Sequence, residues 1–247
     1  MNDRHDFYLL RFQYLSGRIA VFVTAPFLVL LIKMAGYRVR DLKKHRKDVA
    51  ALFHAHHGPW IICANHLTLI DSAILSYVMF PVWRYMVDYH LLAWNLPEKR
   101  NFQRNPVMTL LCFLLKCIPV VRRGDRQSIK TCFAKCGYLL EQRENIMIFP
   151  EGTRSRSGRI DTETFFYGPG RLVDSHPDCR VMCLYLRGDR QTTYSDIPVP
   201  NDVFTFAVAT CDVDRKLSGL KAHRAHSRQI IEKLAEMEKT YFDTRGQ

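Results

Sequence analysis

Trp60-Ile-Ile-Cys-Ala-Asn65-His66-Leu-Thr-Leu-Ile-Asp71 is the stretch of sequence that decides the fold. Its first five residues are all apolar, as in a strand that is buried on both faces of a parallel sheet. Polar residues interrupt the run at Asn65 and His66, and the apolar run Ser72–Phe80 after Asp71 is long enough for a helix. Strand, loop and helix in this order predict an α/β fold, with a site in the loop at the carboxyl end of the strand.

The same alternation of short apolar runs and helical patterns continues along the chain. The predicted strands are Trp60–Ala64, Arg84–Val87, Ile118–Val121, Ile146–Phe149, Val181–Leu186 and Val203–Ala209. Helices are predicted at Ser72–Phe80, at Pro106–Cys117, across Ile129–Leu140 and from about Leu217 to Phe242. These elements predict a mostly parallel central sheet that helices cover on both faces.

The most hydrophobic segment, Ile19–Ile32, is followed by Arg38–Lys47, which holds six strong positive charges and a single acid. A helix of this apolar length reaches about 21 Å, short of the ~30 Å hydrocarbon layer of a bilayer. Pro26 would also kink it. We therefore expect a monotopic helical membrane anchor in residues 1–52, with the basic residues at anionic headgroups, and a separate domain in 53–247. A buried helical hairpin with an ordinary solvated basic face is the alternative.

The net charge of +12 favours an anionic partner, which could be nucleic acid, acidic lipid or a phosphorylated substrate. Because the basic cluster adjoins a membrane-type segment and no nucleic-acid-binding module is recognisable, we expect an anionic membrane surface and no nucleic acid. None of the eight cysteines forms a C-x-x-C pair, so we expect no metal site. Free thiols in apolar runs indicate a reducing compartment, and we place the protein on the cytoplasmic face of the cell (inner) membrane.

A histidine at a strand end and an aspartate five residues later can meet, and His66 and Asp71 have this spacing. Such an Asp would hold the imidazole tautomer and stabilise the imidazolium, although Asp71 could instead cap the following helix. No G-x-S-x-G nucleophile motif is present. The simplest mechanism therefore has no covalent enzyme intermediate: His66 deprotonates an acceptor hydroxyl, which attacks an activated acyl group directly.

A second polar motif, Phe149-Pro150-Glu151-Gly152-Thr153-Arg154-Ser155, follows the predicted strand Ile146–Phe149. Its glycine permits close backbone approach, and its hydroxyl and guanidinium groups suit a phosphate. Arg122 and Arg123 follow the predicted strand Ile118–Val121 in the same way. An ordinary surface turn is the alternative for the second motif.

Together these residues resemble the glycerolipid acyltransferases, the family of 1-acylglycerol-3-phosphate acyltransferase, which has four ordered sequence blocks. The first block, Asn-His followed after four residues by Asp, matches Asn65, His66 and Asp71, with Thr68 where Ser is common. The third block, Phe-Pro-Glu-Gly-Thr-Arg-Ser, matches Phe149–Ser155 at every position. Two specific motifs in the right order make the resemblance unlike a chance match.

The other two blocks match less closely. The second ends in an Arg that contacts the acceptor phosphate, and Arg123 aligns best with it. The fourth corresponds to Val181–Gly188, with Met182 where Pro is usual. The family's Phe-Lys-x-Gly after the third block reads Phe165-Phe166-Tyr167-Gly168 here, without the Lys. These departures concern the acceptor and how its phosphate is held, and they do not involve His66.

The resemblance implies transfer of a fatty acyl group from acyl-CoA or acyl carrier protein, as co-substrate, to lysophosphatidic acid, with no cofactor. His66 and Asp71 would be catalytic. The implied substrate-binding residues are Arg123, Glu151, Gly152, Thr153 and Arg154. Another lysophospholipid or hydroxylated lipid is the alternative acceptor, and a catalytically silent membrane-binding protein is the alternative from another class.

Overall fold

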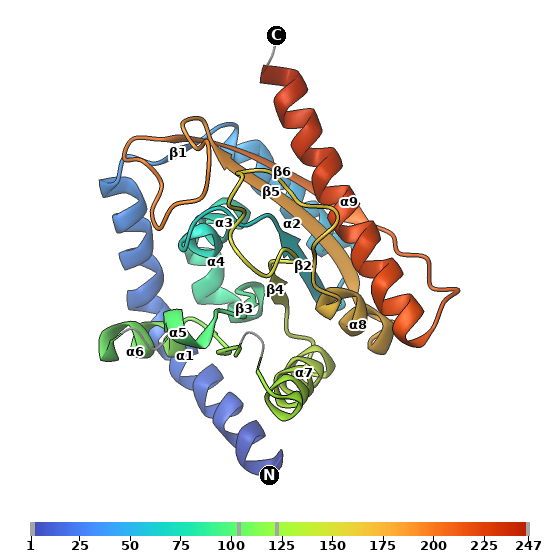
Figure 1. Ribbon diagram of the computed structural model, residues 1–247. Helices are drawn as coiled ribbons and strands as arrows, with labels where there is room; N and C mark the ends of the chain where they lie inside the picture. The colour runs from blue at the N-terminus through green and yellow to red at the C-terminus, as the bar shows by residue number, and fades with distance from the viewer. Residues whose placement is uncertain (1–2, 103–104, 122–123, 246–247) are drawn as a thin grey trace.

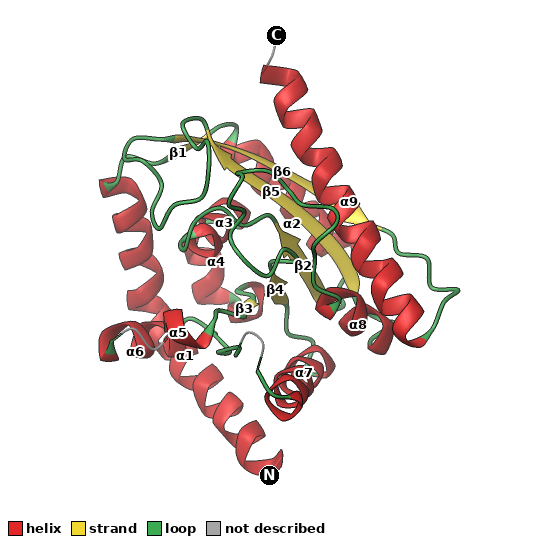
Figure 2. Ribbon diagram, viewed as in Figure 1, coloured by secondary structure: helices red, strands yellow, loops and turns green. Residues whose placement is uncertain are grey.

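A six-stranded mixed sheet lies at the centre of the computed structural model, which describes residues 3–102, 105–121 and 124–245 (Figures 1 and 2). Its strands are β1 (Arg38–Val39), β2 (Trp60–Ala64), β3 (Trp94–Asn95), β4 (Ile146–Ile148), β5 (Arg180–Gly188) and β6 (Val203–Cys211). They are ordered β1-β6-β5-β2-β4-β3, and every neighbouring pair is parallel except β5 and β6. The predicted α/β fold with a mostly parallel sheet is confirmed.

Helices cover both faces of the sheet. They are α1 (Asp3–Met34), α2 (Leu42–Ala55), α3 (Asp71–Met79), α4 (Val82–Val87), α5 (Lys99–Phe102), α6 (Pro106–Leu114), α7 (Arg126–Glu141), α8 (Gly168–Ser175) and α9 (Gly219–Arg245), with a 3₁₀ turn η1 (Tyr89–Leu91). Side chains of Trp60, Ile62 and Ala64 enter a core shared with α1 to α4. Ile61 and Cys63, on the opposite face, enter a core shared with α7, α8 and α9. The uniformly apolar sequence of β2 thus reflects burial on both sides.

The predicted strand Arg84–Val87 is wrong, because these residues form the end of helix α4. The Arg84 N–H donates to the Pro81 carbonyl at 2.9 Å, and the Asp88 N–H donates to the Arg84 carbonyl at 2.8 Å. A run of four residues, of which Arg84 is charged, is too short for its period to distinguish strand from helix.

The predicted strand Ile118–Val121 is also absent as a strand, although the segment lies beside β3 and its extension. The Ile118 N–H donates to the Asn95 carbonyl and the Val120 N–H to the Pro97 carbonyl, both at 2.8 Å. Only isolated bridges result. The rung between them is missing because Pro97, which faces the Ile118 carbonyl in this register, has no N–H to donate.

The apolar N-terminal helix is much longer than the expected 14 residues. Helix α1 has 32 residues and continues through Pro26. Within the described residues, the one helix long and apolar enough to cross a membrane is this one, over Asp6–Met34. At 1.5 Å per residue these 29 residues reach about 43 Å, so the expectation that the segment is too short to span a bilayer was wrong.

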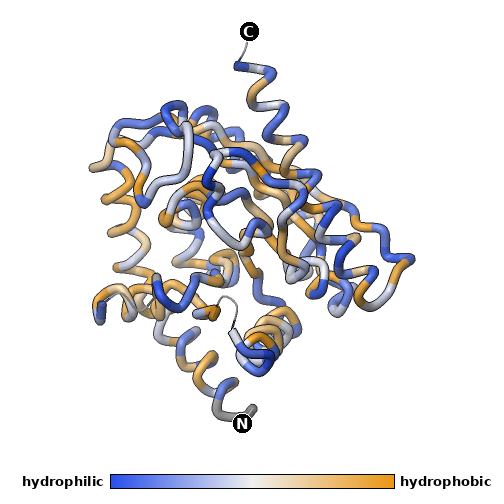
Figure 3. Tube along the Cα trace, viewed as in Figure 1, coloured by the Kyte–Doolittle hydropathy of each residue, from blue (hydrophilic) through white to orange (hydrophobic). Residues whose placement is uncertain are grey.

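Apolar residues recur along much of helix α1 (Figure 3). The helix packs against the domain along its length while it exposes a second apolar face. Leu10, Val21 and Ile32 are buried, and the helix contacts α3, α4, α6 and α7. Strand β1 and helix α2, which follow α1, pack on β6 and α3 respectively. The boundary at residue 52 stays a prediction.

Candidate functional site

His66 and Asp71 meet at the carboxyl end of β2, as their spacing predicted. Nδ1 of His66 lies 3.0 Å from Oδ2 of Asp71, and both side chains are largely buried. The His66 ring stacks on Phe149 at a centroid distance of 4.1 Å. Because Nδ1 faces the carboxylate, Nε2 is the nitrogen that remains for a substrate.

The Asp71 carboxylate organises the whole loop between strand and helix. Its Oδ2 accepts the backbone N–H groups of Leu67 at 2.7 Å and Thr68 at 2.8 Å, and its Oδ1 accepts the Thr68 hydroxyl at 2.5 Å. The alternative that Asp71 caps its own helix is therefore wrong: the side chain faces back over residues 66–68. Thr68 is fully buried, which makes it a structural partner of Asp71.

Neighbouring segments fix the backbone on both sides of His66. The Asn65 side chain extends the pairing of β2 with β5, since its amide donates to the Leu186 carbonyl at 2.9 Å and accepts the Leu186 N–H at 2.8 Å. The Ser155 N–H donates to the His66 carbonyl at 2.9 Å, and the Ser195 N–H donates to the Leu67 carbonyl at 3.0 Å. Strand β5 and two loops far apart in sequence thus hold the backbone that carries the imidazole.

Glu151 and Gly152 form the turn directly beneath this loop. Oε1 of Glu151 accepts the His66 N–H at 2.9 Å. Burial raises the pKa of Glu151 to about 8, and this hydrogen bond opposes the shift. Gly152 has a φ of +65°, and an added Cβ would collide with the Phe166 ring, so the turn requires glycine. Glu151 therefore contacts the backbone of His66 and not its ring.

The three predicted phosphate ligands, Arg123, Thr153 and Arg154, have different positions in the structure. Nη1 of Arg154 donates to the Ser195 carbonyl at 2.8 Å and lies 2.7 Å from Oδ1 of Asp196. Thr153 is exposed. Arg123 lies outside the described residues. The contact of Arg154 with the segment 194–196 had no signal in the sequence.

An apolar cavity of about 590 Å³ extends from His66 into the body of the protein. Its walls come from β2–α3, the 149–152 turn and the helices α1, α3, α4, α6, α7 and α8. Helix α1 supplies Val21, Ala25, Leu28 and Ile32 to one wall. The lining is overwhelmingly apolar, so the cavity suits a hydrocarbon chain.

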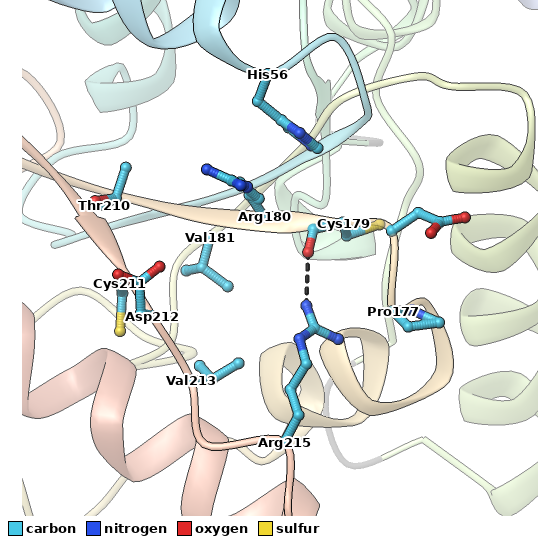
Figure 4. Close-up of a pocket in the computed structure, with 11 residues that line it drawn as sticks. His56, Pro177, Cys179, Arg180, Val181, Thr210, Cys211, Asp212, Val213 and Arg215 are labelled. Atoms are coloured by element: carbon cyan, nitrogen blue, oxygen red, sulfur yellow. Dashed lines mark hydrogen bonds between the residues drawn. The ribbon is translucent and has the colours of Figure 1, made fainter.

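A second cavity, of about 410 Å³, lies at the opposite end of β5 from the His66 loop, around Arg180 and Val181 (Figure 4). Arg215 lines this cavity, and its guanidinium donates to the Cys179 carbonyl at 2.7 Å and to the Val173 carbonyl at 3.2 Å. That cation therefore serves the fold. Within the described ranges, no cluster of three or more His, Cys, Asp or Glu side chains is placed to hold a metal ion.

A protein-family model described as acyltransferase matches residues 38–199. The matched range begins at β1 and contains His66, Asp71 and the whole of the 149–155 motif. A comparison with curated proteins gives no match.

Proposed function

The chain belongs to the acyltransferase family, and from that premise we propose that it moves a fatty acyl group from acyl-CoA or acyl carrier protein to the hydroxyl of lysophosphatidic acid, making phosphatidic acid. Membership of the family indicates acyl transfer to a lipid acceptor. One observation carries the finer proposal: His66, paired with Asp71, lines an apolar cavity of about 590 Å³.

In this proposal His66 acts as the general base. Nδ1–H donates to Asp71, so the lone pair of Nε2 accepts the proton of the acceptor hydroxyl. The hydroxyl oxygen attacks the thioester carbonyl and forms the new C–O bond. The C–S bond then breaks, and the leaving thiolate takes the proton back from His66. Asp71 stabilises the imidazolium between these two proton transfers.

The apolar cavity is where the acyl chain would lie. Because His66, Phe149 and Gly152 line one part of the cavity and helical side chains line the rest, a chain bound there would hold its carbonyl near Nε2. Binding energy from the remote methylenes then helps to position the reacting atoms.

Arg123, Arg154 and Thr153 are the proposed ligands of the acceptor phosphate, with Glu151 and Gly152 shaping the turn that carries them. One observation favours the alternative of another lysophospholipid or hydroxylated lipid as acceptor. Arg154 is already paired with Asp196 through Nη1, and this pairing offsets part of the positive charge that an acceptor phosphate would meet.

We also propose monotopic attachment to the cytoplasmic leaflet. Packing, and not length, is the argument against a spanning helix, since α1 contacts α3, α4, α6 and α7. The exposed face of α1 includes Phe12, Leu15, Ile19, Phe22, Val23, Phe27 and Leu30. Helix α6 is almost wholly apolar yet has no buried residue, which suits lipid contact beside α1 (Figure 3).

The test is an assay of the purified protein with labelled acyl-CoA or acyl carrier protein and a panel of acceptors. We expect labelled phosphatidic acid from lysophosphatidic acid, and none from the His66→Ala variant. Faster transfer to a lysophospholipid with a blocked phosphate would select the alternative acceptor. A folded protein that labels no acceptor would support the silent membrane-binding protein.

A further inference from the structure

Four of the eight cysteines line the apolar cavity. They are Cys112 of α6, Cys117 just after α6, and Cys132 and Cys136 of α7. All four are free thiols. Half of the cysteines of the chain therefore line the cavity that suits a hydrocarbon chain. Cysteine can serve as a small apolar side chain in a core, but that role alone does not require four thiols around one cavity.

The four thiols form two pairs. The Cys117 N–H donates to the Cys112 carbonyl at 3.1 Å, and the Cys117 thiol donates to the Leu115 carbonyl at 3.8 Å. Cys132 and Cys136 lie one turn apart on α7. In each pair the neighbouring thiol lowers the pKa of one cysteine, Cys112 or Cys132, and this cysteine is also the less buried of the two. An electrophile in the cavity therefore reaches these two sulfur atoms first, and a lower pKa favours the nucleophilic thiolate.

We propose that Cys112 and Cys132 form a modification site for long-chain α,β-unsaturated aldehydes, which enter the cavity and are captured covalently. The cavity selects the hydrocarbon tail, and the thiol pairs supply the nucleophile. Water-soluble electrophiles have no such preference for the cavity.

The chemistry is a conjugate addition. The thiolate sulfur forms a bond with the β-carbon, the carbon–carbon π bond breaks, and the proton lost by the thiol is replaced by one at the α-carbon. Neither an oxidant nor a reductant is required. The adduct keeps its alkyl tail in the cavity, and on the proposed function it would exclude the acyl donor.

Cys211 is a built-in control with matched chemistry in a different place. Like Cys112 and Cys132 it is half-buried, and a hydrogen bond from a partner thiol, Cys183, lowers its pKa. It faces the second cavity, beside Arg180, Asp212 and Arg215 (Figure 4). That lining is charged and does not suit an alkyl chain.

The experiment treats the full-length protein with trans-2-hexadecenal or with trans-2-butenal in the same maltoside detergent, then with borohydride to fix the adducts. Peptide mass spectrometry follows the rate at each cysteine. We expect the long aldehyde to label Cys112 and Cys132 at least about tenfold faster than the short one, because its tail is buried. Cys211 should show no such preference. Palmitate, which cannot react, should protect Cys112 and Cys132 and leave Cys211 unprotected.

Equal preference for the long aldehyde at Cys211, or no protection by palmitate, would overturn the proposal. A Cys112→Ser, Cys132→Ser variant should lose the long-chain adduct, whereas Cys211→Ser should retain it, with circular dichroism confirming that both fold. The readout is independent of acyl transfer. Selective labelling of a protein without acyltransferase activity would contradict the proposed function and support this site. An active protein without selective labelling would support the proposed function and contradict this site.

Discussion

Nη1 of Arg154 lies 2.7 Å from Oδ1 of Asp196, and this pair joins the 149–155 motif to the loop that contains Ser195 and Asp196. The same loop exchanges backbone hydrogen bonds with the loop that joins His66 to Asp71. The Leu69 N–H donates to the Asp196 carbonyl at 3.1 Å, and the Ser195 N–H donates to the Leu67 carbonyl at 3.0 Å. Arg154 therefore has two possible roles: it can stabilise this loop, and it can bind an acceptor phosphate.

Substitution of Arg154 and, separately, of Asp196 distinguishes these two roles. If Arg154 binds phosphate, Arg154→Ala should raise the acceptor KM well above the donor KM. Asp196→Ala should lower the acceptor KM or leave it unchanged, because it frees the guanidinium. Both changes should cost about 1 kcal/mol of stability or less, since Asp196 is mostly exposed. Equal losses of kcat in the two variants, with unchanged acceptor KM, would assign Arg154 to the loop.

Asp71→Asn should lower kcat by roughly 10²–10⁴-fold, because the imidazolium loses its stabilising carboxylate. It should also lower the melting temperature, since one oxygen that accepts backbone N–H groups becomes an amide or is turned away. His223 and Asp174 provide a matched control, a second His–Asp pair at 3.0 Å that does not line the apolar cavity. His223→Ala should retain near-normal turnover. If it is as inactive as His66→Ala, the loss reports folding and not base catalysis.

Glu151 should make stability depend on pH. Its pKa is about 8 in the fold, against an ordinary value of 4.5, so the folded state keeps a proton that the unfolded chain releases between these values. The stability that this group contributes is present below pH 4.5 and is lost as the pH rises through about 8. Glu151→Gln keeps an acceptor for the His66 N–H and cannot titrate. The melting temperature of the wild type relative to this variant should fall from pH 5 to pH 9, and a constant difference would contradict the assignment.

Three exposed lysines of α2 should carry the attraction to anionic lipid. Arg40 is held by Asp189 in two hydrogen bonds of 2.5 and 2.6 Å, and Arg46 donates to the Tyr77 carbonyl, so these two serve the fold. Converting Lys43, Lys44 and Lys47 to Gln should weaken binding to anionic vesicles by roughly 100-fold, at ~1 kcal/mol per residue near the surface. Binding to neutral vesicles should not change.

The matched control removes the same charge elsewhere, by converting the exposed Lys216, Lys221 and Lys239 to Gln. Vesicle sedimentation should show little effect of this control, and high salt should reduce wild-type binding to the level of the α2 variant. Equal weakening by both triple variants would mean that net charge alone matters. Protection of the N-terminus from protease inside sealed vesicles would show a spanning helix.

The sequence predicted those parts of the fold that depend on long or repeated patterns. Strand β2 was predicted at its observed bounds, and α3 within one residue at each end. Burial of a strand on both faces, or of a helix along one face, produces a pattern of apolar residues that extends over the whole element. Strands β1 and β3 have two residues each, too few for any period. Helix α4 was misread for the same reason. Helix α1 continues through Pro26, so this proline does not end the helix, and the kink expected there stays a prediction.

For the site, residues close in sequence were predictable and tertiary contacts were not. The approach of Asp71 to His66 follows from a turn of five residues, and it is present. Contacts of Arg154 with Asp196 and of Glu151 with the backbone of His66 join segments that are 42 and 85 residues apart. Residue type suggested a phosphate for Arg154, and only the folded chain reveals the partners that Arg154 and Glu151 already have.

One face of helix α1 lines the apolar cavity, and another face is exposed. This double role limits how the enzyme can be made water-soluble. Deleting residues 3–34 would remove Val21, Ala25, Leu28 and Ile32 and open the cavity to solvent. Replacement by an unrelated transmembrane segment would restore attachment without restoring that wall. A soluble form should instead keep the helix and exchange the outward side chains, such as Phe12, Ile19 and Val23, for polar ones.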